Sequence, residues 1–214
     1  MQAIRSLRLG ACLAIGVLVA SPVCASPIQI TVDTSGLSGP GTLAFDFTDG
    51  GPPPNSATIS DFATDGSLGD ACVTHDLATC DPAPKLSDGA VTLDDSLFPF
   101  TEYRQSITFG NSFSFLLDTS GNPAEPGSQP DGLSLFLLDS DAAFSLVDTA
   151  DPTGALFVYA IGEAEPLQVF TSLVQLPSAA PEPGALALGL AGLLGLALAR
   201  AGPNKNSNRR NVIA

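Results

Sequence analysis

The sequence predicts an all-β protein, a jelly-roll-like sandwich of about nine or ten strands, on the basis of three observations. Apolar and polar residues alternate with a period of two in short segments, beginning with Ile28, Ile30 and Val32. Turn-forming residues are abundant, with 21 glycines and 18 prolines among 214 residues. No stretch between residues 26 and 180 sustains a helical period, so this region is expected to consist of strands and turns.

The first elements are strands bounded by turn residues. Residues 28–33 and 43–48 both alternate, and the glycine-rich stretch 35–41 connects them. Two alternating segments around such a connection are expected to pair as a hairpin. The segment 50–55 (GGPPPN) breaks the pattern, and 57–62 follows as a further short strand.

The middle of the chain combines an irregular insert with a second expected hairpin. Residues 63–89 are expected to form the insert, and 90–93 resumes a strand. Residues 104–109 and 112–118 are strands joined by Gly110-Asn111, a strong hairpin-turn signal.

The last elements follow a loop that contains three prolines, at 119–131. The continuous apolar run 133–138 (LSLFLL) suits a central strand. A short candidate strand follows at 144–147, and strands at 155–161 and 167–173 complete the set. Most of the phenylalanines fall on these strands, so the phenylalanines are expected to form the core.

Charge is segregated along the chain. Residues 26–180 carry two basic residues against 21 acidic ones, a net charge of −19, whereas both ends are basic. A body this acidic repels nucleic acid, so no nucleic-acid partner is expected. Cations, neutral sugars and basic partners remain open as ligands.

Residues 1–25 have the three parts of a secretory signal peptide. Arg5 and Arg8 precede an apolar stretch at 9–20, and Val23-Cys24-Ala25 suits the cleavage positions. Cleavage is expected after residue 25. The Sec translocon and signal peptidase are therefore expected partners of the precursor.

The mature chain keeps two cysteines, Cys72 and Cys80, which lie eight positions apart in the insert. In an exported protein such a pair is most simply a disulfide. The alternative is a zinc site formed by the two cysteines and His75, with Asp70 or Asp76 as a fourth ligand.

Catalytic signatures are weak, and the protein is expected not to be an enzyme. His75 is the only histidine, and no Gly-x-Ser-x-Gly elbow, P-loop or dinucleotide fingerprint is present. Asp94-Asp95 and other aspartates at strand ends leave a glycosidase as an alternative, although aspartate is also a favoured turn residue. No cofactor is expected, except that a loop cluster of aspartates would suit calcium. The calcium candidates are Asp139, Asp141, Asp148 and Asp151.

The C-terminal region combines an uncharged run with a basic end. Residues 184–199 carry no charge, and a transmembrane helix is expected at 184–201. The basic tail at 200–214 is expected to stay in the cytoplasm, leaving the body outside the inner membrane. Its basic residues are Arg200, Lys205, Arg209 and Arg210.

Pro181-Glu182-Pro183, followed by this helix and basic end, resembles the PEP-CTERM sorting signal of Gram-negative bacteria. The resemblance covers residues 181–210 and implies recognition by exosortase, with cleavage near the motif. It divides the chain into the signal peptide, a sandwich domain at 26–176 and a sorting signal at 177–214. The body is similar to the uncharacterised β-rich regions that such proteins carry.

These features favour an exported surface or extracellular-matrix protein with a non-enzymatic structural or adhesive role. Extracellular polysaccharide, as in a biofilm, is then the expected environment and an expected partner. The alternative is a carbohydrate- or calcium-binding β-sandwich module, and a hydrolase is the third hypothesis.

Overall fold

The computed structural model describes residues 27–76 and 78–177. Its regular elements in these residues are strands, and within them no helix is long and apolar enough to cross a membrane. The predicted signal peptide (1–25) and the predicted sorting signal lie outside the described residues. The latter comprises the 181–183 motif, the helix at 184–201 and the basic tail at 200–214.

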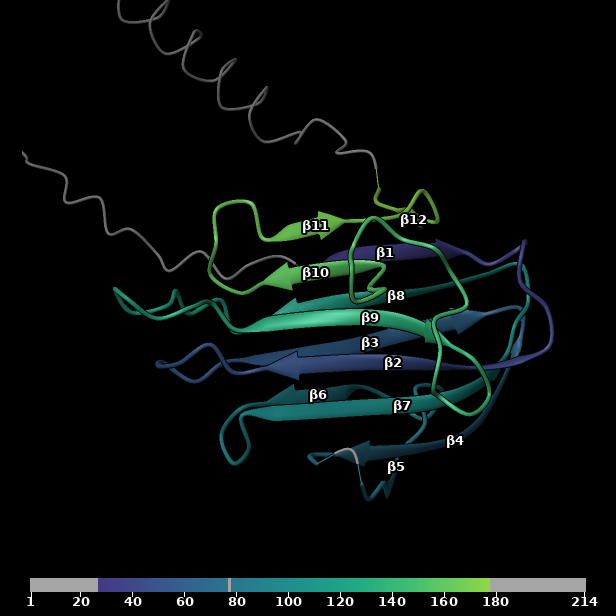
Figure 1. Cartoon of the computed structure of the whole chain (residues 1–214), viewed down its shortest axis with the longest axis horizontal. Coiled ribbons are helices and arrows are strands. Elements are labelled where there is room, and N and C mark those ends of the chain that lie inside the picture. The colour runs from purple at the N-terminus through teal and green to yellow at the C-terminus, as the bar shows by residue number, and fades with distance from the viewer. Residues whose placement is uncertain (1–26, 77, 178–214) are drawn as a thin grey trace, which may run out of the picture.

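Two antiparallel sheets form the body, as Figure 1 shows, with the seven-stranded sheet nearer the viewer. The five-stranded sheet has the order β12 (Val174–Gln175), β1 (Ile28–Asp33), β8 (Ser112–Thr119), β3 (Ser56–Thr64) and β6 (Val91–Asp94). The seven-stranded sheet has the order β11 (Leu167–Val169), β10 (Phe157–Ala160), β9 (Gly132–Leu138), β2 (Pro40–Thr48), β7 (Phe100–Thr108), β4 (Ser67–Thr74) and β5 (Asp81–Ala83). The predicted all-β sandwich is therefore confirmed at the level of two packed sheets.

The first eight strands pair in a nested way, first with last. β1 pairs with β8, β2 with β7, β3 with β6 and β4 with β5. β9, β10 and β11 extend one sheet beyond β2, and β12 extends the other beyond β1. Because nested partners lie far apart in sequence, the loops at one end of the sandwich bring distant residues together.

The core lies between the sheets and is built from the alternating residues that predicted the strands. The Phe115 ring of β8 meets the Phe45 ring of β2 edge-on, with ring centres 5.4 Å apart and an interplanar angle of 86°. It also meets the Phe157 ring of β10, 6.5 Å away. All three side chains are at most 1% exposed, and each buried aromatic of this size contributes roughly 1.5–3 kcal/mol.

Neither expected hairpin forms, because both connections cross from one sheet to the other. β1 and β2 lie in different sheets, and so do β7 and β8. At Gly110-Asn111 the backbone instead packs against neighbouring connections. The carbonyl oxygen of Asn111 accepts the Thr34 amide at 2.8 Å, and its side-chain amide donates to Asp65 Oδ2 at 2.6 Å. The Gly-Asn pair therefore makes a close approach between loops rather than a hairpin turn.

The insert at 63–89 is more regular than predicted, since it contains β4 and β5 at the edge of the seven-stranded sheet. A register shift between Leu68 and Ala71 interrupts the pairing of β4 with β7, and β5 has only three residues. A shifted strand and a very short strand have no clear period of two, which explains why the pattern missed them. Conversely, the candidate strand at 144–147 makes one isolated bridge, between Ser145 and Leu138.

The predicted disulfide between Cys72 and Cys80 is present, with Cα atoms 5.3 Å apart. It joins β4 to the segment that precedes β5. Because both sulfurs are used in this bond, neither is a thiolate ligand, and the zinc arrangement predicted as the alternative is not formed.

Candidate metal centre

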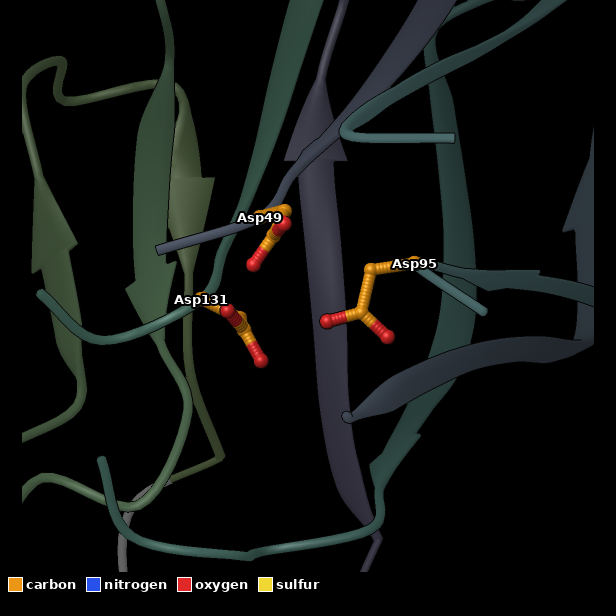
Figure 2. A group of neighbouring side chains, drawn as sticks. All are labelled: Asp49, Asp95 and Asp131. Atoms are coloured by element: carbon orange, nitrogen blue, oxygen red, sulfur yellow. The ribbon is translucent and has the colours of Figure 1, made fainter. Parts of the chain in front are cut away.

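Three aspartates from different parts of the chain meet at one end of the sandwich. Asp49 directly follows β2, Asp95 directly follows β6, and Asp131 directly precedes β9. Thr48 and Gly132 are paired in the register of β2 and β9, so the neighbouring Asp49 and Asp131 lie side by side. One carboxylate oxygen from each of the three lies within 4.8 Å of the others, and Figure 2 shows the side chains converging.

Asp131 is held rigidly, because it is 1% exposed and both of its oxygens accept hydrogen bonds. Oδ1 accepts the Gly50 amide at 2.6 Å, and Oδ2 accepts the Asn55 side-chain amide at 2.7 Å. The Asn55 backbone amide donates to Asp95 Oδ1 at 3.1 Å. Asn55, itself 5% exposed, therefore orients two of the three carboxylates.

The loop after β2 can approach Asp131 only because residue 50 is glycine. A β-carbon at Gly50 would collide with the carbonyl oxygens of Gln129 and Pro130. The Gly50 carbonyl in turn accepts the Gln129 amide at 3.1 Å. The loop also positions Asp49, whose Oδ1 accepts the Gly51 amide at 2.6 Å.

The three carboxylates raise the electrostatic free energy of one another. The pKa of Asp95 is raised, first because burial disfavours the charged form and then because of the charges of Asp131 and Asp49. The hydrogen bond from the Asn55 amide opposes this shift. A cation bound between the carboxylates would remove the repulsion.

Chemically, this arrangement suits a hard cation with oxygen ligands. Calcium binds oxygens at about 2.3–2.6 Å, so two ligands of one ion lie at most about 5 Å apart. The separation of up to 4.8 Å among the three carboxylate oxygens satisfies that limit. A hollow of about 130 Å³ adjoins Asp49 and Asp95 and is also lined by Gly51, Pro52 and Pro54. Backbone carbonyls and water would complete the six to eight ligands that calcium requires.

The four predicted calcium ligands are placed differently. Asp139 Oδ1 accepts the Ala143 amide at 2.8 Å, and Asp151 Oδ2 accepts the Thr153 amide at 3.0 Å. Hydrogen bonds from the Thr153 hydroxyl, which contributes most, and from the Ala155 and Thr153 backbone amides hold the pKa of Asp151 below its ordinary value. Within residues 27–76 and 78–177, the potential metal ligands that come together as a group of three are Asp49, Asp95 and Asp131. Asp141 and Asp148 do not belong to this group.

The other residues singled out in the sequence have separate surroundings. His75 Nδ1 lies 3.1 Å from Thr101 Oγ1, and the imidazole stacks on the Phe98 ring. Asp94 Oδ1 accepts the Ser96 amide at 2.9 Å and so stabilises the β6–β7 loop. Of the Asp94-Asp95 pair, only Asp95 joins the acidic group.

A second acidic pair lies away from this site, on the outward face of the seven-stranded sheet. Asp46 is directly opposite Glu102 in the register of β2 and β7, and Glu102 is 4% exposed. Arg104 Nη2 pairs with Glu102 Oε2 at 2.6 Å. Burial, and then the charge of Glu102, raise the pKa of Asp46 to about 7, although Arg104 opposes the shift.

Sequence reasoning missed Asp49 and Asp131 because it looked for acidic residues that are close in sequence. The three aspartates are separated by more than 30 residues from one another, and nothing local relates them. The available signal was positional: each of the three directly flanks a strand end. Which strand ends share one end of the sandwich depends on the pairing of the sheets.

Comparison with known proteins gave no match: no family model, curated protein or solved structure is significantly similar to this chain.

Proposed function

We propose that this protein is exported, sorted by exosortase and located at the cell surface or in the extracellular matrix, with a non-enzymatic structural or adhesive role. The observation that carries the proposal is the combination of Pro181-Glu182-Pro183, the uncharged run at 184–199 and the basic tail at 200–214 with the signal sequence at 1–25. In this proposal the inner membrane holds the precursor, and the body remains outside it.

The Cys72–Cys80 disulfide supports export, because such bonds persist in oxidising compartments and are rare in the cytosol. It closes a short loop in the seven-stranded sheet. An exported protein that meets changing conditions gains from such a cross-link, which contributes about 2–3 kcal/mol in the chain-entropy model.

We infer that the body is a jelly roll, supported by the nested pairing of β1 with β8, β2 with β7, β3 with β6 and β4 with β5. A non-enzymatic role is supported by the contacts of the histidine and the two cysteines, side chains that often serve in nucleophilic catalysis. His75, the only histidine, stacks on Phe98, and Cys72 and Cys80 are bonded to each other.

The test is the intact mass of the exported protein from cells with and without the exosortase. We expect the mature chain to begin at Ser26 and to end near Glu182 when the enzyme is present, and to keep residues 184–214 when it is absent. A chain that keeps the helix and basic tail in both strains would refute the sorting proposal. Deletion of the gene is expected to reduce cell aggregation or matrix retention, and unchanged behaviour would refute the adhesive role.

The second candidate function is a calcium-binding module, which the convergence of Asp49, Asp95 and Asp131 favours over the loop at 139–151. Calcium at about 100 times its Kd would stabilise the fold by about 2.7 kcal/mol, which corresponds to roughly 5–10 °C in Tm. We expect this shift to disappear in Asp49→Asn and to remain in Asp139→Asn, a matched control whose carboxylate binds its own turn. Titration calorimetry that detects no calcium binding to the wild type would refute this candidate.

A further inference from the structure

Two rings from different loops form an exposed platform at the edge of the sandwich. Phe98, in the β6–β7 loop, stacks on His75, which follows β4, with ring centres 4.0 Å apart and an interplanar angle of 20°. Phe98 remains 43% exposed, and the adjacent Leu97 is 82% exposed. Consecutive apolar side chains at a loop tip are unfavourable in water, and they are typical of a surface that binds something.

Two hollows adjoin this ring pair and share Val73, His75 and Phe98 as lining residues. One hollow, of about 180 Å³, adds the hydroxyls of Thr92, Ser96 and Thr101 and the carboxylate of Asp94. The other, of about 270 Å³, adds Thr79 and the carboxylates of Asp76 and Asp81. Both hollows that adjoin the rings are therefore lined by hydroxyls and hydrogen-bond acceptors.

The platform is fixed before any ligand arrives. The Cys72–Cys80 disulfide closes the loop that carries His75, and Thr101 Oγ1 lies 3.1 Å from His75 Nδ1. The Phe98 loop is anchored at its base, where the Asp49 amide donates to the Pro99 carbonyl at 2.9 Å. A rigid platform loses little conformational entropy on binding, which favours affinity.

The lining groups define the chemistry of the ligand. An aromatic ring attracts the C–H face of a partly apolar saturated ring. The carboxylates around it accept hydrogen bonds from the hydroxyls of a polyol, and the serine and threonine hydroxyls both donate and accept them. None of the lining residues of either hollow is lysine or arginine, and three are aspartates, so an anionic ligand is disfavoured. Asp76 already accepts a hydrogen bond from the Ala78 amide, and Asp94 accepts one from the Ser96 amide. Carboxylates engaged in this way are better suited to accept a further hydrogen bond from a ligand hydroxyl than to form an ion pair with a cationic ligand.

We propose that the His75–Phe98 platform and its two hollows bind neutral sugar units of an extracellular polysaccharide. This inference rests on the proposed location of the protein at the cell surface or in the matrix, and it assigns the contact through which the body would adhere. The carboxylates are expected to exclude uronic-acid polymers.

The test uses the exported protein and three oligosaccharide probes: a neutral β-glucan hexamer, a partly deacetylated chitin hexamer and a polyuronate hexamer. Hexalysine serves as a cationic peptide probe. We expect the neutral hexamer to bind in titration calorimetry and the polyuronate not to bind. Selective binding of hexalysine would overturn the proposal in favour of a basic protein partner. Silence from the neutral hexamer, whether or not the partly deacetylated chitin hexamer binds, would also overturn it.

Matched variants locate the binding. Phe98→Ala is expected to weaken binding of the neutral hexamer at least tenfold, while Phe98→Tyr keeps the ring and the affinity. Phe144→Ala is the control, because Phe144 is 74% exposed but belongs to the β9–β10 connection. Equal affinities of Phe98→Ala and Phe144→Ala would refute the site.

A measurement on the wild type avoids any effect of the variants on folding. Addition of the hexamer is expected to shift the amide resonances of Ser96, Leu97 and His75 in the NMR spectrum, and shifts confined to other loops would refute the site. A protein that is cleaved near Glu182 but binds no sugar would refute this inference and leave the proposed sorting intact.

Discussion

Replacing Asp46 by asparagine is expected to stabilise the protein, and to do so far more at pH 8 than at pH 5. Asp46 faces Glu102 across the β2–β7 pair, and its Oδ1 is buried without a hydrogen-bond partner among the described residues. Burial and this neighbouring acid raise the pKa of Asp46 to about 7. An asparagine amide would be neutral and would be able to donate a hydrogen bond to Glu102.

The magnitude follows from the two pKa values of Asp46, about 7 in the folded protein and 3.8 as the ordinary value in the unfolded chain. Because the folded state holds the proton more tightly, stability falls as the pH rises from about 4 to 7. By linkage, this difference in the pKa of Asp46 between the folded and unfolded states lowers the free energy of unfolding by about 2 kcal/mol at pH 5 and by about 4 kcal/mol at pH 8. The stabilisation by Asp46→Asn should therefore be about 2–3 kcal/mol larger at pH 8.

Urea unfolding of the exported protein at pH 5 and pH 8, followed by far-UV circular dichroism with EDTA present, measures this difference. Asp61→Asn is the matched control, because Asp61 is an exposed aspartate in β3, and its effect should be small at both pH values. If the effect of Asp46→Asn on the free energy of unfolding is the same at both pH values, the Asp46 carboxylate is solvated in the folded protein and the reasoning is wrong.

Three further predictions concern the stability of the fold. Phe115→Ala is expected to lower the free energy of unfolding by about 3–5 kcal/mol, because it leaves a cavity between the sheets, and urea unfolding checks this; a loss below about 1 kcal/mol would contradict the assigned core. Gly110→Ala should cost about 1–3 kcal/mol, because its β-carbon would lie 2.6 Å from the Gly66 nitrogen, and an unchanged Tm would contradict this contact. Replacing both Cys72 and Cys80 by serine should lower stability by about 2–3 kcal/mol, whereas added reductant should leave the stability of that variant unchanged.

Local pattern predicted several features of the body correctly because they depend only on neighbouring residues. Alternation identified β1, β2 and β8, since a strand buried on one face must alternate. The disulfide was predicted because Cys72 and Cys80 are an isolated pair, eight positions apart, in a chain expected to be exported, and the bond is present. The same reasoning failed at β4 and β5, where a register shift and a three-residue length remove the period.

The sequence by itself determined the strand-rich character of the body, the segregation of charge and the resemblance of its C-terminal region to a sorting signal, because each is a local or compositional property. Only the tertiary structure decided which strands pair, and thereby which strand ends meet. Gly110-Asn111 has the composition of a hairpin turn, but packing of the two sheets makes it a crossing between them. The same reason applies to two groups of neighbours, the aspartates Asp49, Asp95 and Asp131 and the ring pair His75 and Phe98. The members of each group are distant in the chain, so only the long-range contacts of the nested strand pairing bring them together.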